Sequence, residues 1–116
     1  MTTRQNKVNS LLEHLVASYV LTQKFEGLTG LLTIKKAEVT ADLEHAKIFF
    51  SVIGQDPETT LRVLNRHLRE VQHMLRQNLK MKIVPRIAFA PDLSGEYADH
   101  ISKLIQEIHN DDKRDA

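Results

Sequence analysis

A chain of 116 residues with 41% hydrophobic and 27% charged side chains is long enough for one domain with a single core. It contains no cysteine, which excludes disulfide bonds, thiolate metal sites and cysteine nucleophiles. The formal net charge of +1 averages over an uneven distribution, because residues 61–86 carry seven basic side chains and one acidic one. A basic segment between acidic flanks indicates a polyanionic partner.

The first half of the chain predicts a helix followed by a hairpin. Hydrophobic residues at three- and four-residue spacing predict a helix over residues 3–23, and alternation predicts strands over residues 31–40 and 45–53. The adjacent pair Lys35 and Lys36 interrupts the alternation of the first strand, which predicts a bulge at that point. Because only residues 41–44 join the two strands, we expect them to pair in an antiparallel hairpin.

The second half predicts a long helix, a third strand and a final helix. The long helix is expected from Pro57, with Asp56 as its N-cap, to about Leu79. The third strand is expected over residues 82–90, and the final helix over residues 94–109. A right-handed crossover would place the third strand parallel to the second. The fold class is therefore α+β, with a three-stranded mixed sheet and helices on one face.

Residues 1–110 are expected to form this single domain, and residues 111–116 a disordered acidic tail. The sequence shows no apolar segment typical of a secretory signal or a membrane span, so we expect a cytoplasmic protein without a membrane partner.

The long predicted helix carries its charges on one side. Its cations recur every three or four residues, so at 100° per residue they fall within about 40° of one line about 27 Å long. This cation row consists of Arg62, Arg66, Arg69, His73, Arg76 and Lys80. An ordinary solvated helix face mixes positive and negative charges, because opposite charges at this spacing stabilise the helix and like charges destabilise it slightly. A row of like charges therefore favours an RNA-binding surface over an ordinary solvated face. Further candidate contacts are Lys82, Arg86, Lys35 and Lys36, whereas the role of Lys47 depends on which sheet face is covered.

Catalytic and metal-binding patterns are missing from the sequence. The six histidines form no His-x-x-x-His pair, and Ser10 and His14 lack an orienting acid. Gly27-Leu28-Thr29-Gly30 has the spacing of an RNA-clamping loop, but its place between the first helix and a strand indicates a turn. We therefore expect no enzyme activity, metal, cofactor or small-molecule substrate.

Two segments of the chain resemble a known family. The run from Glu38 to Val52 has an Asp-Leu turn and an Ala-Lys start to its second strand, and the run from Leu79 to Asp92 contains Val84-Pro85. With these sequence features in this order along the chain, the protein resembles the ribosome-binding factor A family, whose fold is similar to a type II KH domain. The resemblance covers about residues 4–108. It implies a monomer that binds the free small ribosomal subunit through 16S rRNA and assists its late maturation, including maturation of the 16S rRNA 5′ end.

The chain departs from the family's pattern at two places. Members usually have a Lys-Asp-Pro-Arg-Leu-type segment before the first strand, where this chain reads Lys24-Phe25-Glu26-Gly27-Leu28. Members also usually break the long helix with Ala-x-Gly, where this chain reads His67-Leu68-Arg69. The substitution leaves open whether the helix is kinked.

Two alternatives remain open from the residues alone. The basic helix could dock an acidic protein, which would make the chain a protein-interaction or regulatory α+β module. Phe49 is expected on the sheet face opposite Phe50, where either the C-terminal helix covers it, as we prefer, or a partner contacts it.

Overall fold

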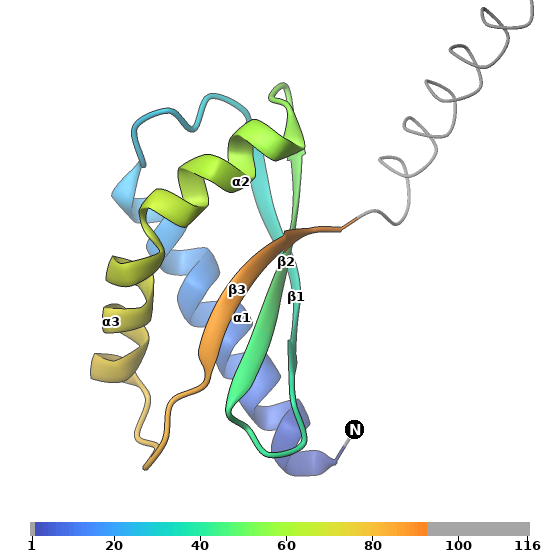
Figure 1. Ribbon diagram of the computed structural model, residues 1–116, viewed down its shortest axis with the longest axis vertical. Coiled ribbons are helices and arrows are strands. Elements are labelled where there is room, and N and C mark those ends of the chain that lie inside the picture. The colour runs from blue at the N-terminus through green and yellow to red at the C-terminus, as the bar shows by residue number, and fades with distance from the viewer. Residues whose placement is uncertain (1, 93–116) are drawn as a thin grey trace, which may run out of the picture.

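The computed structural model describes residues 2–92, which form three helices and a three-stranded sheet (Figure 1). The helices are α1 (Thr3–Gln23), α2 (Pro57–Arg66) and α3 (Leu68–Asn78). The strands are β1 (Leu31–Val39), β2 (His45–Ile53) and β3 (Arg86–Pro91). This content confirms the predicted α+β class. The predicted helix over residues 94–109 and the predicted tail over residues 111–116 lie outside the described residues.

The sheet has the predicted topology. β1 and β2 pair in antiparallel fashion, and β3 pairs with β2 in parallel, which gives the strand order β1-β2-β3. The pairing register shifts between Ile34 and Lys36, so the predicted bulge is confirmed. The segment containing Gly27 and Gly30 forms the predicted turn, with the Leu28 amide donating to the Phe25 carbonyl at 3.2 Å.

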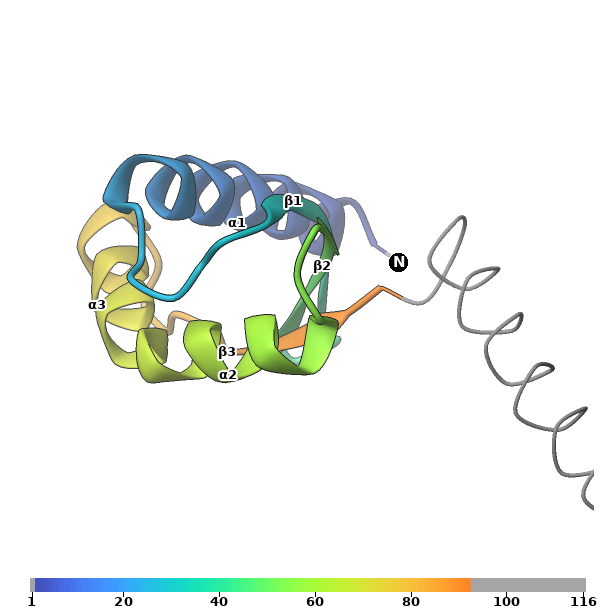
Figure 2. The same ribbon diagram turned by 90° about the horizontal axis from the view of Figure 1, so that it is seen from above.

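All three helices pack on one side of the sheet (Figure 2). α1 packs on β1, α2 on β3 and β2, and α3 on α1 and β3. Alternate side chains of β2 and β3 are buried under the helices, including Ile48, Phe50, Ile87 and Phe89. The intervening side chains, such as Lys47, lie on the opposite face of the sheet, as the two-residue period of a strand requires.

Polar side chains of α1 hold it against the edge strand β1. The Val39 amide donates to Asn9 Oδ1 at 2.8 Å, and the Ala37 amide donates to Glu13 Oε1 at 2.9 Å. The Gln5 side chain donates to the Val39 carbonyl at 3.3 Å. An edge strand leaves such backbone groups without a strand partner, so α1 satisfies them and covers this part of the edge.

The long helix expected over residues 57–79, whose continuity the sequence leaves open, is broken into two helices. The helix is interrupted at His67, whose φ of −103° and ψ of 7° separate α2 from α3. Neither glycine nor proline causes the interruption. Its physical reason is packing, because α2 covers β2 and β3 whereas α3 turns to contact α1.

The third strand begins later than predicted, at Arg86 rather than Lys82. α3 ends at Asn78, so residues 79–85 form a connection between α3 and β3. The side chain of Gln72 fixes the end of this connection: its Nε2 donates to the Pro85 carbonyl at 2.9 Å, and its Oε1 accepts the Ile87 amide at 3.0 Å. Between these two bonds, the Arg86 amide donates to the Glu44 carbonyl at 2.9 Å, so the pairing of β3 with β2 begins at this anchor.

Candidate nucleic-acid interface

α2 presents two arginines of the cation row to solvent. Arg62 and Arg66 are exposed, whereas Val63 and Leu64 on the other side of the helix are buried in the core. Asp56 caps the helix by accepting the Thr59 amide at 3.0 Å. The amphipathic pattern of α2 therefore turns both arginines outward, as the sequence predicts.

α3 presents the next three members of the cation row. Arg69, His73 and Arg76 are exposed, and they recur at four- and three-residue spacing on this helix. Val71 and Leu75, on the side that packs against the rest of the protein, are fully buried. The three side chains thus share one solvent-facing side of α3.

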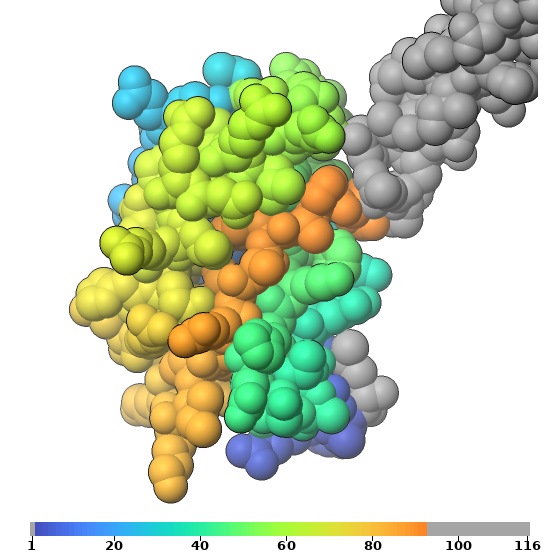
Figure 3. All heavy atoms as spheres, viewed as in Figure 1, coloured from blue at the N-terminus to red at the C-terminus, as the bar shows by residue number. Residues whose placement is uncertain are grey.

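The interruption at His67 bends the cation row. Arg62 and Arg66 belong to α2, the next three members belong to α3, and Lys80 lies in the connection beyond α3. α2, α3 and β3 nevertheless form one continuous surface of the molecule (Figure 3). The expected single straight line is therefore wrong, and two neighbouring groups of cations replace it.

The cations of this surface are not neutralised within the described part of the chain. In residues 2–92 the ion pairs are Lys36 with Glu38, at 3.3 Å, and His67 with Glu70. Neither pair includes a cation of residues 61–86 other than His67, and all seven basic side chains of that segment are exposed. Unneutralised cations on a continuous surface attract a polyanion and release its counterions on binding.

Glu70, the one acid of the basic segment, contacts His67 and Tyr19 and forms no ion pair with the arginines or lysines of that segment within residues 2–92. Glu70 bonds to the His67 ring, and it accepts a hydrogen bond of 2.8 Å from the Tyr19 hydroxyl of α1. The hydrogen bonds from His67 and then from Tyr19 lower the pKa of the Glu70 carboxyl below its ordinary value. The same contact with Glu70 raises the pKa of the Tyr19 hydroxyl.

The structure places the two lysines of β1 apart from the helix cations. Lys36 pairs with Phe49 across the hairpin, and its ammonium lies 5.0 Å from the centre of that ring on the open face of the sheet. Lys35 is exposed at the bulge, and Arg86 begins β3 on the open face opposite His45. Whether the C-terminal segment covers Phe49 lies outside the described residues; within residues 2–92 the ring is half-buried beneath Lys36.

Sequence reasoning missed Arg4, which lies near Lys80 and Lys82 beside a groove. The three residues come from two distant parts of the chain, so no spacing in the sequence connects them. Residues 2–92 contain no group of three or more potential metal ligands. None of the helices in that range is both long and apolar enough to cross a membrane.

Comparisons with known proteins point to one family. The family model described as ribosome-binding factor A matches residues 4–105. The chain is 30% identical over 112 residues to ribosome-binding factor A of Staphylococcus epidermidis, covering 95% of this chain and 97% of that protein.

Solved structures share the fold. The crystal structure of ribosome-binding factor A from Thermus thermophilus matches with a TM-score of 0.68 and 22% identity, over 75% of this chain and 93% of that one. A homology model of the Thermus thermophilus factor, fitted into a cryo-EM map of its complex with the 30S subunit, matches with a TM-score of 0.61 and 23% identity. That match covers 72% of this chain and 90% of that one.

Proposed function

Because the chain belongs to the ribosome-binding factor A family, we propose that it binds the small ribosomal subunit through rRNA and assists the late maturation of that subunit. The proposal includes maturation of the 5′ end of 16S rRNA. It assigns the protein a binding role in the cytoplasm, without catalysis or a cofactor. The 30S complex of the Thermus thermophilus factor supports the choice of partner.

The observation that carries the proposal is the surface formed by α2, α3 and the connection to β3. Its arginines and lysines are exposed, and they have no carboxylate partner within residues 2–92. Such cations neutralise phosphates and bind more weakly as salt is raised. A folded rRNA region presents phosphates along a defined shape, which a surface of this kind recognises without reading base edges.

Sedimentation of the tagged protein with cell lysate tests the partner. We expect the protein to migrate with free small subunits on a sucrose gradient, and not with whole ribosomes. The double substitution Arg66→Glu and Arg69→Glu should move it to the top of the gradient at moderate salt.

The matched control reverses two charges on α1 and just beyond it, Lys7→Glu and Lys24→Glu, which should leave the protein with the small subunit. If the Arg66 and Arg69 double variant stays with the small subunit, the proposed interface is wrong. If the wild-type protein stays at the top of the gradient at low salt as well, an acidic protein partner becomes the better explanation of the surface.

The maturation role has its own test. In cells that lack the protein, primer extension should show 16S rRNA with an unprocessed 5′ end. Wild-type protein should restore the mature end, and the Arg66 and Arg69 double variant should not. Normal 5′ ends in the depleted cells would remove this part of the proposal.

A further inference from the structure

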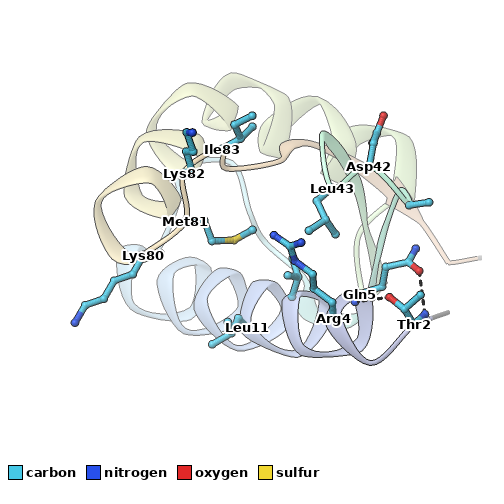
Figure 4. A pocket seen from close by; sticks show the side chains of 12 residues that line it. Thr2, Arg4, Gln5, Leu11, Asp42, Leu43, Lys80, Met81, Lys82 and Ile83 are labelled. Carbon is cyan, nitrogen blue, oxygen red and sulfur yellow. Dashed lines mark hydrogen bonds between the residues drawn. The ribbon is translucent and has the colours of Figure 1, made fainter.

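A groove of about 660 Å³ lies at the end of the molecule that contains the N-terminus of α1 (Figure 4). Three parts of the chain form it: the first turns of α1, the turn between β1 and β2, and the connection between α3 and β3. Its volume falls within the range of about 300–1,000 Å³ that is typical of small-ligand sites.

The inside of the groove is apolar. Val8 and Leu43 are buried at its base, and the Met81 side chain points into it (Figure 4). Leu11 and Ile83 also line it, and they remain 48% and 60% exposed. Leu11 belongs to the hydrophobic pattern of α1, but here it faces the groove rather than the core. Exposed apolar side chains around a hollow are typical of a surface that a ligand covers.

Cations surround this apolar base. Figure 4 shows the Arg4 guanidinium reaching over the groove between Met81 and Leu43, whereas Lys80 and Lys82 extend outward from the connection. All three cations are exposed and have no ion pair within residues 2–92.

The acid beside the groove, Asp42, is engaged in the hairpin turn. Its Oδ1 accepts the Thr40 hydroxyl at 2.5 Å and the Glu44 amide at 3.0 Å, and within residues 2–92 it forms no ion pair with Arg4. The groove lining carries three cations and this one carboxylate, so its net charge is positive and suits an anionic ligand.

We propose that this groove binds an unpaired nucleotide of RNA. An exposed base can lie on the apolar side chains and against the plane of the Arg4 guanidinium, while neighbouring phosphates contact Lys80 and Lys82. A base held in a duplex is stacked and paired, so it cannot enter. The inference rests on the proposed function, because Lys80 is both the end of the cation row and part of the groove. An RNA strand whose phosphates follow α3 reaches the groove at this residue.

Binding of three RNA probes tests the groove: a hairpin, the same hairpin with a short single-stranded tail, and the tail alone. We expect the tail to strengthen hairpin binding about tenfold in fluorescence anisotropy. Leu11→Glu and Arg4→Glu should each abolish that gain and leave the affinity for the untailed hairpin within about threefold.

Two matched controls place the same charge changes on α1 outside the groove. Leu21→Glu repeats the change of Leu11 at another exposed leucine, and Lys7→Glu repeats the charge reversal of Arg4. Both controls should keep the gain from the tail, and circular dichroism should show that all four variants are folded.

The outcomes separate the groove from the wider proposal. The groove proposal is wrong, while RNA binding stands, if the hairpin binds but the tail does not raise its affinity. The same holds if the tail still raises the affinity of the Leu11→Glu and Arg4→Glu variants. If the tail binds but the untailed hairpin does not, and both substitutions weaken binding of the tail, the groove proposal stands and the cation row does not bind structured RNA. If no probe binds, both proposals are wrong.

Crosslinking gives an independent readout. A tail containing 4-thiouridine, irradiated in complex with the wild-type protein, should crosslink to peptides that contain Met81 or residues 4–11. Crosslinks confined to α2 and the first turns of α3 would place the tail elsewhere and overturn the assignment.

Discussion

The imidazole ring of His67 stacks on the phenyl ring of Phe25, with the ring centroids 3.9 Å apart and the planes 2° from parallel. His67 lies at the interruption between α2 and α3, and Phe25 follows α1. The Tyr19 ring meets Phe25 edge-on at 6.1 Å, and the Tyr19 hydroxyl bonds to Glu70 of α3. A cluster of four side chains thus joins α1 to the point at which the helix changes direction.

Both stacked residues stand where the chain departs from the pattern of its family. Phe25 occupies the position of the usual Asp in the segment before the first strand, and His67 occupies that of the usual Ala in Ala-x-Gly. The two departures are therefore in contact with each other. In this chain two stacked aromatic rings therefore lie at the interruption between α2 and α3.

A double-mutant cycle should detect coupling between these rings. We expect Phe25→Leu and His67→Ala each to lower the free energy of unfolding, because Phe25 is only 5% exposed and His67 packs on it. Their combined effect should be smaller than the sum by about 0.5–1.5 kcal/mol, the range for an aromatic pair. Urea unfolding measures all four proteins. The control cycle pairs Phe25→Leu with His73→Ala, whose exposed ring should give additive effects; additivity at His67 as well would contradict the role of the stack.

Glu70 should make the cluster sensitive to acid. Its hydrogen bonds from His67 and Tyr19 lower the pKa of the carboxyl below the ordinary value of 4.5. A carboxyl with a lowered pKa in the folded state contributes stability that is complete above the ordinary value and is lost as the pH falls through the lowered pKa. Glu70→Gln should therefore be less stable than wild type at neutral pH, by less than about 1 kcal/mol for such an exposed group.

The difference between wild type and Glu70→Gln should shrink as the pH falls below 4.5, measured by urea unfolding at a series of pH values. Glu26→Gln is the control, because Glu26 is exposed and has no hydrogen-bond partner within residues 2–92. A difference between wild type and Glu70→Gln that is independent of pH would show that the carboxylate charge is not what stabilises the cluster.

The hairpin could be predicted from the sequence because its hydrophobic period is two. Ala46, Ile48 and Phe50 alternate with polar or half-buried residues, and only a strand with one buried face matches that spacing. The adjacent Lys35 and Lys36 broke the alternation in β1, and this mismatch located the bulge. Local pattern was sufficient because each feature arises within a few residues.

The interruption of the long helix could not be predicted in this way. His67, Leu68 and Arg69 all tolerate a helix, so local propensity gives no signal of a break. The cause lies in tertiary packing, through the contact of His67 with Phe25, which is distant in the sequence. The groove could not be predicted from local pattern either, because Arg4, Leu43 and Met81 come together only when the domain has folded.

Asn9 should be important for stability, although a polar asparagine is unusual at a buried position of a helix. It is 8% exposed, and its Oδ1 accepts the amide of Val39 on the edge strand. Asn9→Ala should leave that amide unpaired in a buried place and lower the free energy of unfolding by about 1–3 kcal/mol. Urea unfolding measures the loss, and hydrogen exchange at the Val39 amide should become faster.

The control for Asn9 is the neighbouring exposed residue, since Ser10→Ala should change stability by less than about 0.5 kcal/mol. Asn9→Asp keeps an oxygen acceptor and should retain slow exchange at Val39. If Asn9→Ala is as stable as Ser10→Ala, the hydrogen bonds of α1 to β1 do not anchor the edge strand.

The salt dependence of RNA binding should distinguish the free cations of the helices from the paired cation of the sheet. Removing one phosphate contact reduces the slope of log affinity against log salt by about 1. We expect that reduction for Arg66→Gln, whose guanidinium has no carboxylate partner within residues 2–92. Lys36→Gln should change the slope less, because Lys36 is paired with Glu38 and lies over the Phe49 ring. Titrations of the same rRNA fragment over a range of KCl concentrations measure both slopes, with Lys7→Gln on α1 as the unaffected control. An effect of Lys36→Gln as large as that of Arg66→Gln would place the RNA across the open face of the sheet, whereas no effect of Arg66→Gln would remove α2 from the interface.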